Sequence, residues 1–350
     1  MGAPGTPRRR RPDLTVPAPT LPAPTLPALD AVRPPRVRRV AVGLLLACAL
    51  LASGCSIQRI ASKSVADSLT RGPDVFGTEN DPELVRDALP FGLKTMEGLL
   101  QTLPRHEGLL VTLCKGFTQY SYAFVASEGD LLVNSDYARA TALHQRAFQL
   151  YLRARDYGLR ALALQHPGIA DSLRLAPERA AARLGTRDLE ALYWTAASWG
   201  SAIALGKDRP EMLADLPAIH ALVNRGLALD ERYDAGAFHE AAIVLDALPP
   251  AMGGSVESAR HHFRRAVEIS GDHRASPYVT LAQSVSVLQQ DRGEFRRLLA
   301  RALEFDPDRE PSQRLATIVL QRKARALLDR QDDFFLDEPG PDSTTAQEKR

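Results

Sequence analysis

Cysteine is scarce in this chain of 350 residues and occurs only as Cys48, Cys55 and Cys114. The first two lie in or next to an N-terminal apolar run, so the remainder of the chain holds a single cysteine. That part can form no intrachain disulfide, and its stability must come from packing. Cys114 lies in an apolar segment with helical spacing, and we expect it to be a small core residue.

A hydrophobic run long enough to span a membrane is also lacking. The apolar stretch Val40–Ala52 follows Arg36, Arg38 and Arg39, and at about 1.5 Å per helical residue it covers roughly 20 Å. A bilayer core is about 30 Å thick, so the stretch predicts the apolar part of a signal peptide. The following Ser53-Gly54-Cys55 resembles the lipobox of bacterial lipoproteins, with Ala52 where that motif prefers leucine.

This resemblance implies a lipoprotein signal peptide over 36–54 and lipidation of Cys55, the alternative being a plain secretory signal cleaved nearby. It implies the periplasmic face of a membrane, and Ser56 in place of aspartate after the cysteine favours the outer membrane. The domain is expected to span 55–335. Residues 1–35 are proline-rich, and they are expected to be a disordered leader or to follow from a start codon assigned too early. Residues 336–350 are expected to form a disordered tail.

An excess of charge of one sign is missing from the domain. The whole chain has a net charge of +2, but residues 1–39 contain eight arginines and two aspartates, so residues 40–350 carry −4. A mildly acidic exported domain gives no electrostatic reason to bind nucleic acid.

Catalytic motifs are absent from the sequence. It contains no Gly-x-Ser-x-Gly elbow, no phosphate-binding glycine loop and no His-Glu-x-x-His. Adjacent His261 and His262 lie about 100° apart on a helix, which suits a shared metal poorly. His239 beside Glu240 is more typical of a polar helix face than of an acid–base pair. We therefore expect no catalytic residue, no metal and no cofactor, and a protein that is not an enzyme.

Helical hairpins are what the sequence does contain, most clearly over 249–269. Pro249 and Pro250 end one helix, Gly253 and Gly254 permit a sharp reversal, and Ser255 can cap the next helix. In that helix apolar residues recur at steps of three and four and form one stripe: Val256, Ala259, Phe263, Ala266 and Val267.

The same design returns elsewhere in the chain. Asp81, Ser276 and Asp291 are each expected to cap a helix, and Asp291 with Glu294 forms a capping box. Pro90 should kink or break the helix in which it lies. Segments that begin at Gly226, Ala266 and Ala302 align at steps of 40 and 36 residues, slightly above a tetratricopeptide repeat. The predicted fold is all-α: stacked helical hairpins that form degenerate tetratricopeptide-like repeats in a solenoid-like bundle.

Several patches together resemble one family, the T-component lipoproteins of tetratricopeptide-associated TRAP transporters (the TatT family). The resemblance spans roughly 56–335 and lies in the following patches: Asp87-Ala-Leu-Pro-Phe-Gly-Leu-Lys, Glu97-Gly-Leu-Leu, Leu109-Leu-Val, Tyr120-Ser-Tyr-Ala-Phe, Tyr193-Trp, Ser198-Trp-Gly and Pro249-Pro-Ala-Met-Gly-Gly-Ser. It implies a lipid-anchored periplasmic homotrimer in which each subunit has a pore or cleft. It further implies that this protein partners a periplasmic TRAP substrate-binding protein, the P-component, and collects, stores or hands over a ligand.

Aromatic side chains suit a cleft for a small organic or apolar ligand, because they offer large apolar faces with a polar edge. The candidates are Tyr120, Tyr122, Tyr193, Trp194 and Trp199, together with His239. For each aromatic, core packing alone is the competing interpretation. The competing function is a lipoprotein scaffold whose hairpins bind a segment of another protein in envelope assembly.

Overall fold

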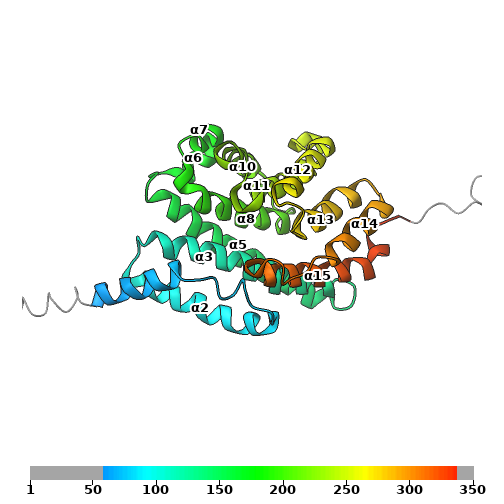
Figure 1. The fold of residues 1–350 in the computed structure, drawn as a ribbon. Coiled ribbons are helices and arrows are strands. Elements are labelled where there is room, and N and C mark those ends of the chain that lie inside the picture. Colours follow the sequence, from blue (N-terminus) through cyan, green and yellow to red (C-terminus); the bar gives the residue numbers. More distant parts are fainter. Residues whose placement is uncertain (1–57, 337–350) are drawn as a thin grey trace, which may run out of the picture. The chain divides into compact units, whose positions relative to one another are not determined.

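The computed structural model describes residues 58–336 (Figure 1). This part of the chain is built from helices and turns and contains no strand, which confirms the predicted all-α class. The predicted leader, signal peptide and lipidated Cys55 lie outside the described residues, as does all but the first residue of the predicted tail.

One of the N-terminal helices has a proline in its interior. A helix over 58–71 precedes α2 (Pro82–Thr102), and Asp81 caps α2 by accepting hydrogen bonds from the backbone N–H groups of Glu83 and Leu84 at 2.9 and 3.2 Å. Of the kink or break expected at Pro90, the break does not occur, because the helix continues through this residue. Buried Leu89 and Leu93 continue one apolar stripe across the proline, and this burial offsets the hydrogen bond that proline cannot donate.

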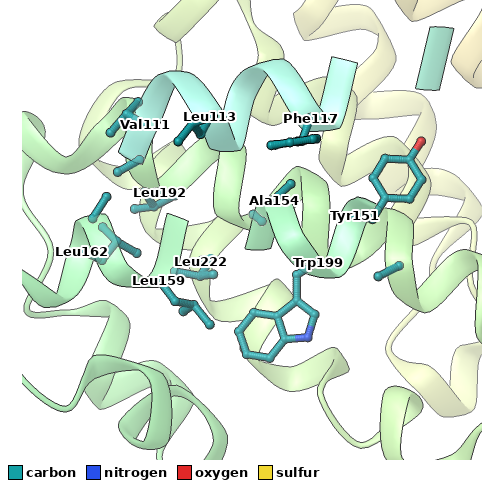
Figure 2. Close-up of a cluster of buried hydrophobic side chains, with 14 of the residues drawn as sticks. Val111, Leu113, Phe117, Tyr151, Ala154, Leu159, Leu162, Leu192, Trp199 and Leu222 are labelled. Carbon is teal, nitrogen blue, oxygen red and sulfur yellow. The ribbon is translucent and has the colours of Figure 1, made fainter. Parts of the chain in front are cut away.

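The central helices form the largest core. They are α3 (Glu107–Tyr120), the π-helical segment η1 (Ser121–Ala126), α4 (Ser127–Leu132), α5 (Tyr137–Ala163), α6 (Ile169–Leu175), α7 (Pro177–Ala181), the 3₁₀ turn η2 (Thr186–Asp188), α8 (Leu189–Leu205), α9 (Pro210–Leu213) and α10 (Leu216–Asp230). Figure 2 shows side chains of α3, α5, α8 and α10, among them Leu113, Ala154, Trp199 and Leu222, in one buried cluster. Cys114 is free and buried within this region, as predicted.

The C-terminal helices are shorter and are separated by tight turns. They are η3 (Tyr233–Ala235), α11 (Ala237–Asp246), η4 (Pro250–Met252), α12 (Val256–Ile269), α13 (Ser276–Leu281), the π-helical segment η5 (Ala282–Ser286), α14 (Arg292–Leu303), η6 (Pro311–Gln313), α15 (Arg314–Asp329) and η7 (Gln331–Asp333). Asp291 caps α14 as predicted, but the Glu294 carboxylate binds Arg260 and Ser286 and does not complete the capping box. Ser276 is the first residue of α13 and not its cap.

Helices that follow one another in the chain pack against one another. In the series α2, α3, α5, α8, α10, α11, α12, α13, α14 and α15, each helix contacts the next, and α15 also contacts α2. In this last contact Arg322 of α15 pairs with Glu83 of α2 at 2.8 Å, and nearby the Leu315 N–H donates to the carbonyl of Gly77, in the loop before α2, at 3.1 Å. The tetratricopeptide-like repeat stays a prediction. Its three aligned small positions, Gly226, Ala266 and Ala302, are all buried.

The hairpin between α11 and α12 depends on its glycines. Gly253 has a φ of 91°, in the left-handed region that glycine tolerates best. A Cβ on Gly254 would lie 1.6 Å from the Leu248 carbonyl oxygen, so no side chain fits there without a backbone shift. Ser255 then caps α12 by accepting the Ser258 N–H at 3.2 Å, while its own N–H donates to the Asp246 carbonyl at 2.7 Å. The reversal therefore fixes the start of α12 against the end of α11.

We expect Gly254→Ala to destabilise the fold by about 2 kcal/mol or more, because the clash is with backbone that cannot rotate away. Gly98→Ala is the matched control, since a Cβ at Gly98 in α2 meets nothing within 4 Å. That change should be neutral or stabilise by up to about 1 kcal/mol through helix propensity. Guanidinium denaturation of both variants measures the difference, and equal midpoints would contradict the role of the turn.

Candidate functional site: an aromatic and ionic cluster beside α8

The six residues predicted to contact a ligand fall in four separate places. Tyr193 and Trp194 lie together on α8, Trp199 lies in the core, Tyr120 and Tyr122 lie at the junction of α3 and η1, and His239 lies on α11. Of the six, only the sequence neighbours Tyr193 and Trp194 have rings in direct contact, and these two form the centre of the candidate site.

Tyr193 and Trp194 belong to a cluster of four aromatic rings. Their rings meet edge to face with centroids 5.0 Å apart, and Tyr193 also contacts Tyr233 of η3 at 5.7 Å and Phe238 of α11 at 5.3 Å. Phe238 fits here because Gly226 of α10 leaves room: a Cβ on that glycine would lie 2.2 Å from the Phe238 ring. Lys115 of α3 approaches the Trp194 ring from another side, at 6.0 Å. Tyr193, Trp194 and Tyr233 are only partly buried, so the cluster combines core packing with accessible aromatic surface.

An ionic group adjoins these rings. Glu240 on α11 accepts a hydrogen bond from the Ser276 hydroxyl at 2.8 Å. Arg274 donates to the backbone carbonyl of Asp234 at 2.7 Å and to its carboxylate at 3.0 Å, and it lies 3.6 Å from Glu310. Within residues 58–336 the buried Nε–H of Arg274 has no hydrogen-bond partner. We call Tyr193, Trp194, Tyr233, Phe238, Glu240 and Arg274 the aromatic–ionic cluster.

The turn that carries Asp234 is conformationally strained. Asp234 and Ala235 have φ values of 43° and 54°, in the left-handed region that is unfavourable for residues with a Cβ. The two hydrogen bonds from Arg274 to Asp234 hold the turn in this conformation. Strain of this kind persists where surrounding contacts enforce it, and here it positions Tyr233 against Tyr193.

Burial determines the protonation of the cluster. It raises the pKa of the Glu240 carboxyl to about 7, although the Ser276 hydroxyl and Arg274 act in the opposite direction. Burial and the nearby Glu240 carboxylate also raise the pKa of the Tyr193 hydroxyl, so this phenol stays protonated at neutral pH. The cluster thus presents aromatic faces, a phenol and a carboxyl whose charge changes near neutral pH.

Trp199 is a core residue with a satisfied polar edge. Its side chain is fully buried, and its indole N–H donates to the Asp215 carboxylate at 3.0 Å. The guanidinium groups of Arg155 and Arg174 lie 5.6 and 5.4 Å from its ring. Five positions separate Trp199 from Trp194 on α8, which places them about 140° apart around the helix.

Tyr120 and Tyr122 lie away from this cluster in the chain and contact different partners. Tyr120 is buried against Phe124 at 5.8 Å and lies beneath the guanidinium of Arg146. Tyr122 is more accessible, and the ammonium group of Lys323 on α15 lies 4.5 Å from its ring. Tyr120 therefore connects α3 to α5, and Tyr122 connects η1 to α15.

His239 does not pair with Glu240, its sequence neighbour. Its Nδ1 lies 2.7 Å from Nδ1 of His262 on α12, so one of the two nitrogens donates to the other, and its Nε2 lies 3.3 Å from Glu231. Burial lowers the pKa of His239 and lowers that of His262 to about 4, so both rings are neutral at pH 7. The pair joins α11 to α12. No group of three or more metal-ligating side chains occurs among residues 58–336.

Comparison with known proteins identifies the family. The family model of the TRAP transporter T-component matches residues 78–335, well over half of the chain. This chain belongs to the TRAP transporter T-component family. It is also similar to an uncharacterized protein of Treponema pallidum (strain Nichols), with 28% identity over 310 residues that cover 83% of this chain and 96% of that protein.

Family membership supports an accessory role for this T-component in TRAP transport, as an envelope-associated protein. Within residues 58–336, no helix has both the length and the apolar composition that crossing a bilayer requires.

Four members of the cluster were not predicted from the sequence. Tyr233, Phe238, Glu240 and Arg274 lie outside α8, and their proximity to Tyr193 depends on how η3, α11 and the start of α13 pack. Glu240 was noted only as a neighbour of His239. One signal was present in the sequence. Ser276 is a polar residue at the start of a predicted helix and was expected to cap it, but its hydroxyl donates to Glu240 instead.

We expect the stability of this T-component to depend on Glu240 and pH. Because its folded pKa of about 7 exceeds its ordinary value of 4.5, the protonated carboxyl contributes stability fully below pH 4.5, and this contribution is lost as pH rises through 7. The loss amounts to at most about 3 kcal/mol. Glu240→Gln has no titrating carboxyl at this position and does not undergo this loss. The unfolding free energy of the variant relative to that of wild type should therefore increase from pH 5 to pH 8.

Guanidinium denaturation at the two pH values measures this gain. Glu257→Gln on the exposed face of α12 is the control and should show no such pH-dependent gain. A Glu240→Gln difference that is equal at pH 5 and pH 8 would show that the carboxyl does not titrate as described.

Proposed function

We propose that this T-component binds or stages a small organic or apolar ligand at the periplasmic face of a membrane and associates with the substrate-binding P-component. The aromatic–ionic cluster is the observation that supports the proposal. Partly buried Tyr193, Trp194 and Tyr233 offer apolar faces, and the Glu240 carboxyl and the Arg274 guanidinium place polar groups beside them. The family supports the transport context, in which the P-component passes ligand on.

The ligand proposal is tested by tryptophan fluorescence, because Trp194 lies in the cluster and Trp199 in the core. We expect a saturable change when the purified protein is titrated with small carboxylates and short-chain fatty acids, and we expect Trp194→Phe to abolish it. Tyr233→Ala should weaken binding roughly tenfold through loss of an aromatic contact. Tyr137→Ala, at an exposed position on α5, is the control and should bind as wild type does. A fluorescence change that persists in Trp194→Phe would place the ligand away from the cluster, and binding of extended peptides only would favour the scaffold function instead.

The anchor proposal rests on Cys55. Each buried methylene of an acyl chain contributes about 0.8 kcal/mol, so a triacylated N-terminus would hold the protein at the membrane for as long as it functions. We expect Cys55→Ser to release the protein from the membrane fraction and to abolish metabolic labelling with palmitate. Cys114→Ser, at the buried free thiol, is the control and should remain labelled. Equal labelling of the two variants would contradict the anchor.

Homotrimer formation is part of the same proposal. Sedimentation of the detergent-solubilised protein, with and without the P-component, measures the oligomeric state and the association together. A monomer that does not bind the P-component would remove the transport role.

A further inference from the structure

Four arginines form a regular row on the solvent-exposed side of α5. Arg139, Arg146, Arg153 and Arg160 follow one another at seven-residue steps, and all four are exposed. Seven residues advance a helix by about 10.5 Å, and each step rotates by only about 20°. The four guanidinium groups therefore follow one face over roughly 30 Å. We call these four residues the arginine ladder.

Three members of the ladder rest on aromatic rings. The guanidinium carbon of Arg146 lies 5.8 Å from the Tyr120 ring, and that of Arg153 lies 5.4 Å from the Phe117 ring. The third, Arg160, lies 5.4 Å from the Tyr157 ring. Cation–π contacts of this kind limit the freedom of long side chains, so the positive charges are held in place before a partner arrives.

Carboxylates neutralise only part of this row. Glu128 pairs with Arg139 at 2.6 Å, and Glu97 lies 3.7 Å from Arg153. Glu97 already accepts hydrogen bonds from Lys94 and Tyr157. Among the described residues, neither Arg146 nor Arg160 has a carboxylate within salt-bridge distance. The ladder is thus a net positive surface on a domain that is otherwise acidic.

The surface beside the ladder is hollowed. A depression of about 480 Å³ is lined by α5 residues, including Gln149, Leu152, Arg153, Tyr157 and Arg160. Its lining combines three guanidinium groups with a phenol ring, two leucines and one carboxylate, that of Asp156, which pairs with Arg155 at 2.8 Å. Arginine, tyrosine and aliphatic side chains are common at protein interfaces. A flat, fully hydrated row of charges would not offer a partner such a depression.

We propose that the arginine ladder is the surface on which an acidic face of the P-component docks, with carboxylates along one of its helices placed opposite the four arginines. This inference rests on the proposed association with the P-component. A membrane surface fits less well, because Tyr137 is the only large hydrophobic residue of α5 that is exposed, and interfacial helices need an apolar face. A second copy docked ladder to ladder would place like charges together, which costs energy.

The test compares two double variants of the full chain in detergent. Arg146→Gln/Arg160→Gln removes the two ladder arginines that lack a carboxylate partner, so no acid is left unpaired. Arg264→Gln/Arg325→Gln on α12 and α15 is the control: both arginines are exposed and have no ion pair among the described residues, and the net charge falls equally. Glutamine is a good helix former, so both variants should fold, and circular dichroism and thermal melting verify this.

We expect the Kd for the purified P-component at 0.15 M salt to rise at least fivefold in the ladder variant and less than twofold in the control, with a shallower salt dependence in the ladder variant. If wild type binds the P-component and the ladder variant binds equally well, the docking surface is wrong while the proposed function stands. If wild type does not bind at all, the proposed association is lost, and the inference is lost with it.

Two further measurements can contradict the inference, each by one stated outcome. Loss of binding to vesicles of phosphatidylglycerol and phosphatidylethanolamine in the ladder variant, with P-component binding unchanged, would assign the ladder to lipid. Dissociation of the homo-oligomer in the ladder variant, with P-component binding unchanged, would assign it to a contact between copies of this chain.

Discussion

The close approach of three helices at Gly158 is the constraint on which the central part of this structure depends. A Cβ at this position of α5 would lie 2.2 Å from the Thr195 hydroxyl oxygen on α8 and 2.9 Å from the Cys114 sulfur on α3. Only glycine allows the three backbones to come this near. Ala154, one turn earlier and fully buried, extends the same narrow contact (Figure 2). Because α5 is fixed here between α3 and α8, one side of the helix is buried and the other is exposed, with half-buried residues such as Leu150 and Tyr157 between them.

Both candidate surfaces follow from that arrangement. On α8, Thr195 and Trp199 are fully buried, while Tyr193 and Trp194 emerge where η3 and α11 pack. On α5, the buried residues lie on one side, and the arginine ladder, with its seven-residue spacing, lies on the exposed side. The aromatic rings beneath the row come partly from α3, which is held at the same crossing. The packing of α3, α5 and α8 at Gly158 therefore positions both the aromatic–ionic cluster and the arginine ladder.

Local signals in the sequence were sufficient to predict the helices. Asp81, Ser255 and Asp291 cap their helices because a short polar side chain can satisfy a terminal N–H with no help from the rest of the fold. The signals failed where a distant partner competed. The Ser276 hydroxyl donates a hydrogen bond to Glu240, and the Glu294 carboxylate accepts one from Arg260. Neither side chain therefore has the capping role that its sequence position suggested. Pro90 did not break α2, because burial on both sides of it mattered more than one lost hydrogen bond.

The candidate site was harder to predict than the fold, for a physical reason. Aromatic residues are drawn to cores and to binding sites alike, so Trp199 and Trp194 look equivalent in the sequence although only one is fully buried. Glu240 and Arg274 carry no local signal, because what distinguishes them is partial burial created by helices far apart in the chain. Family resemblance supplied the function class, and packing alone supplied the cluster.

Charge distribution gives the same division of roles. Residues 40–350 are net acidic, yet arginines with few carboxylate partners gather on the exposed side of α5. A positive row on a negative body produces a strong local field, which orients an acidic partner as it approaches and repels a second acidic surface elsewhere. The aromatic–ionic cluster acts at short range, since its rings and its titrating carboxyl are partly buried and poorly coupled to solvent. In the proposed function the cluster would bind the ligand and the arginine ladder would meet the P-component, and the crossing at Gly158 keeps these two surfaces on different helices.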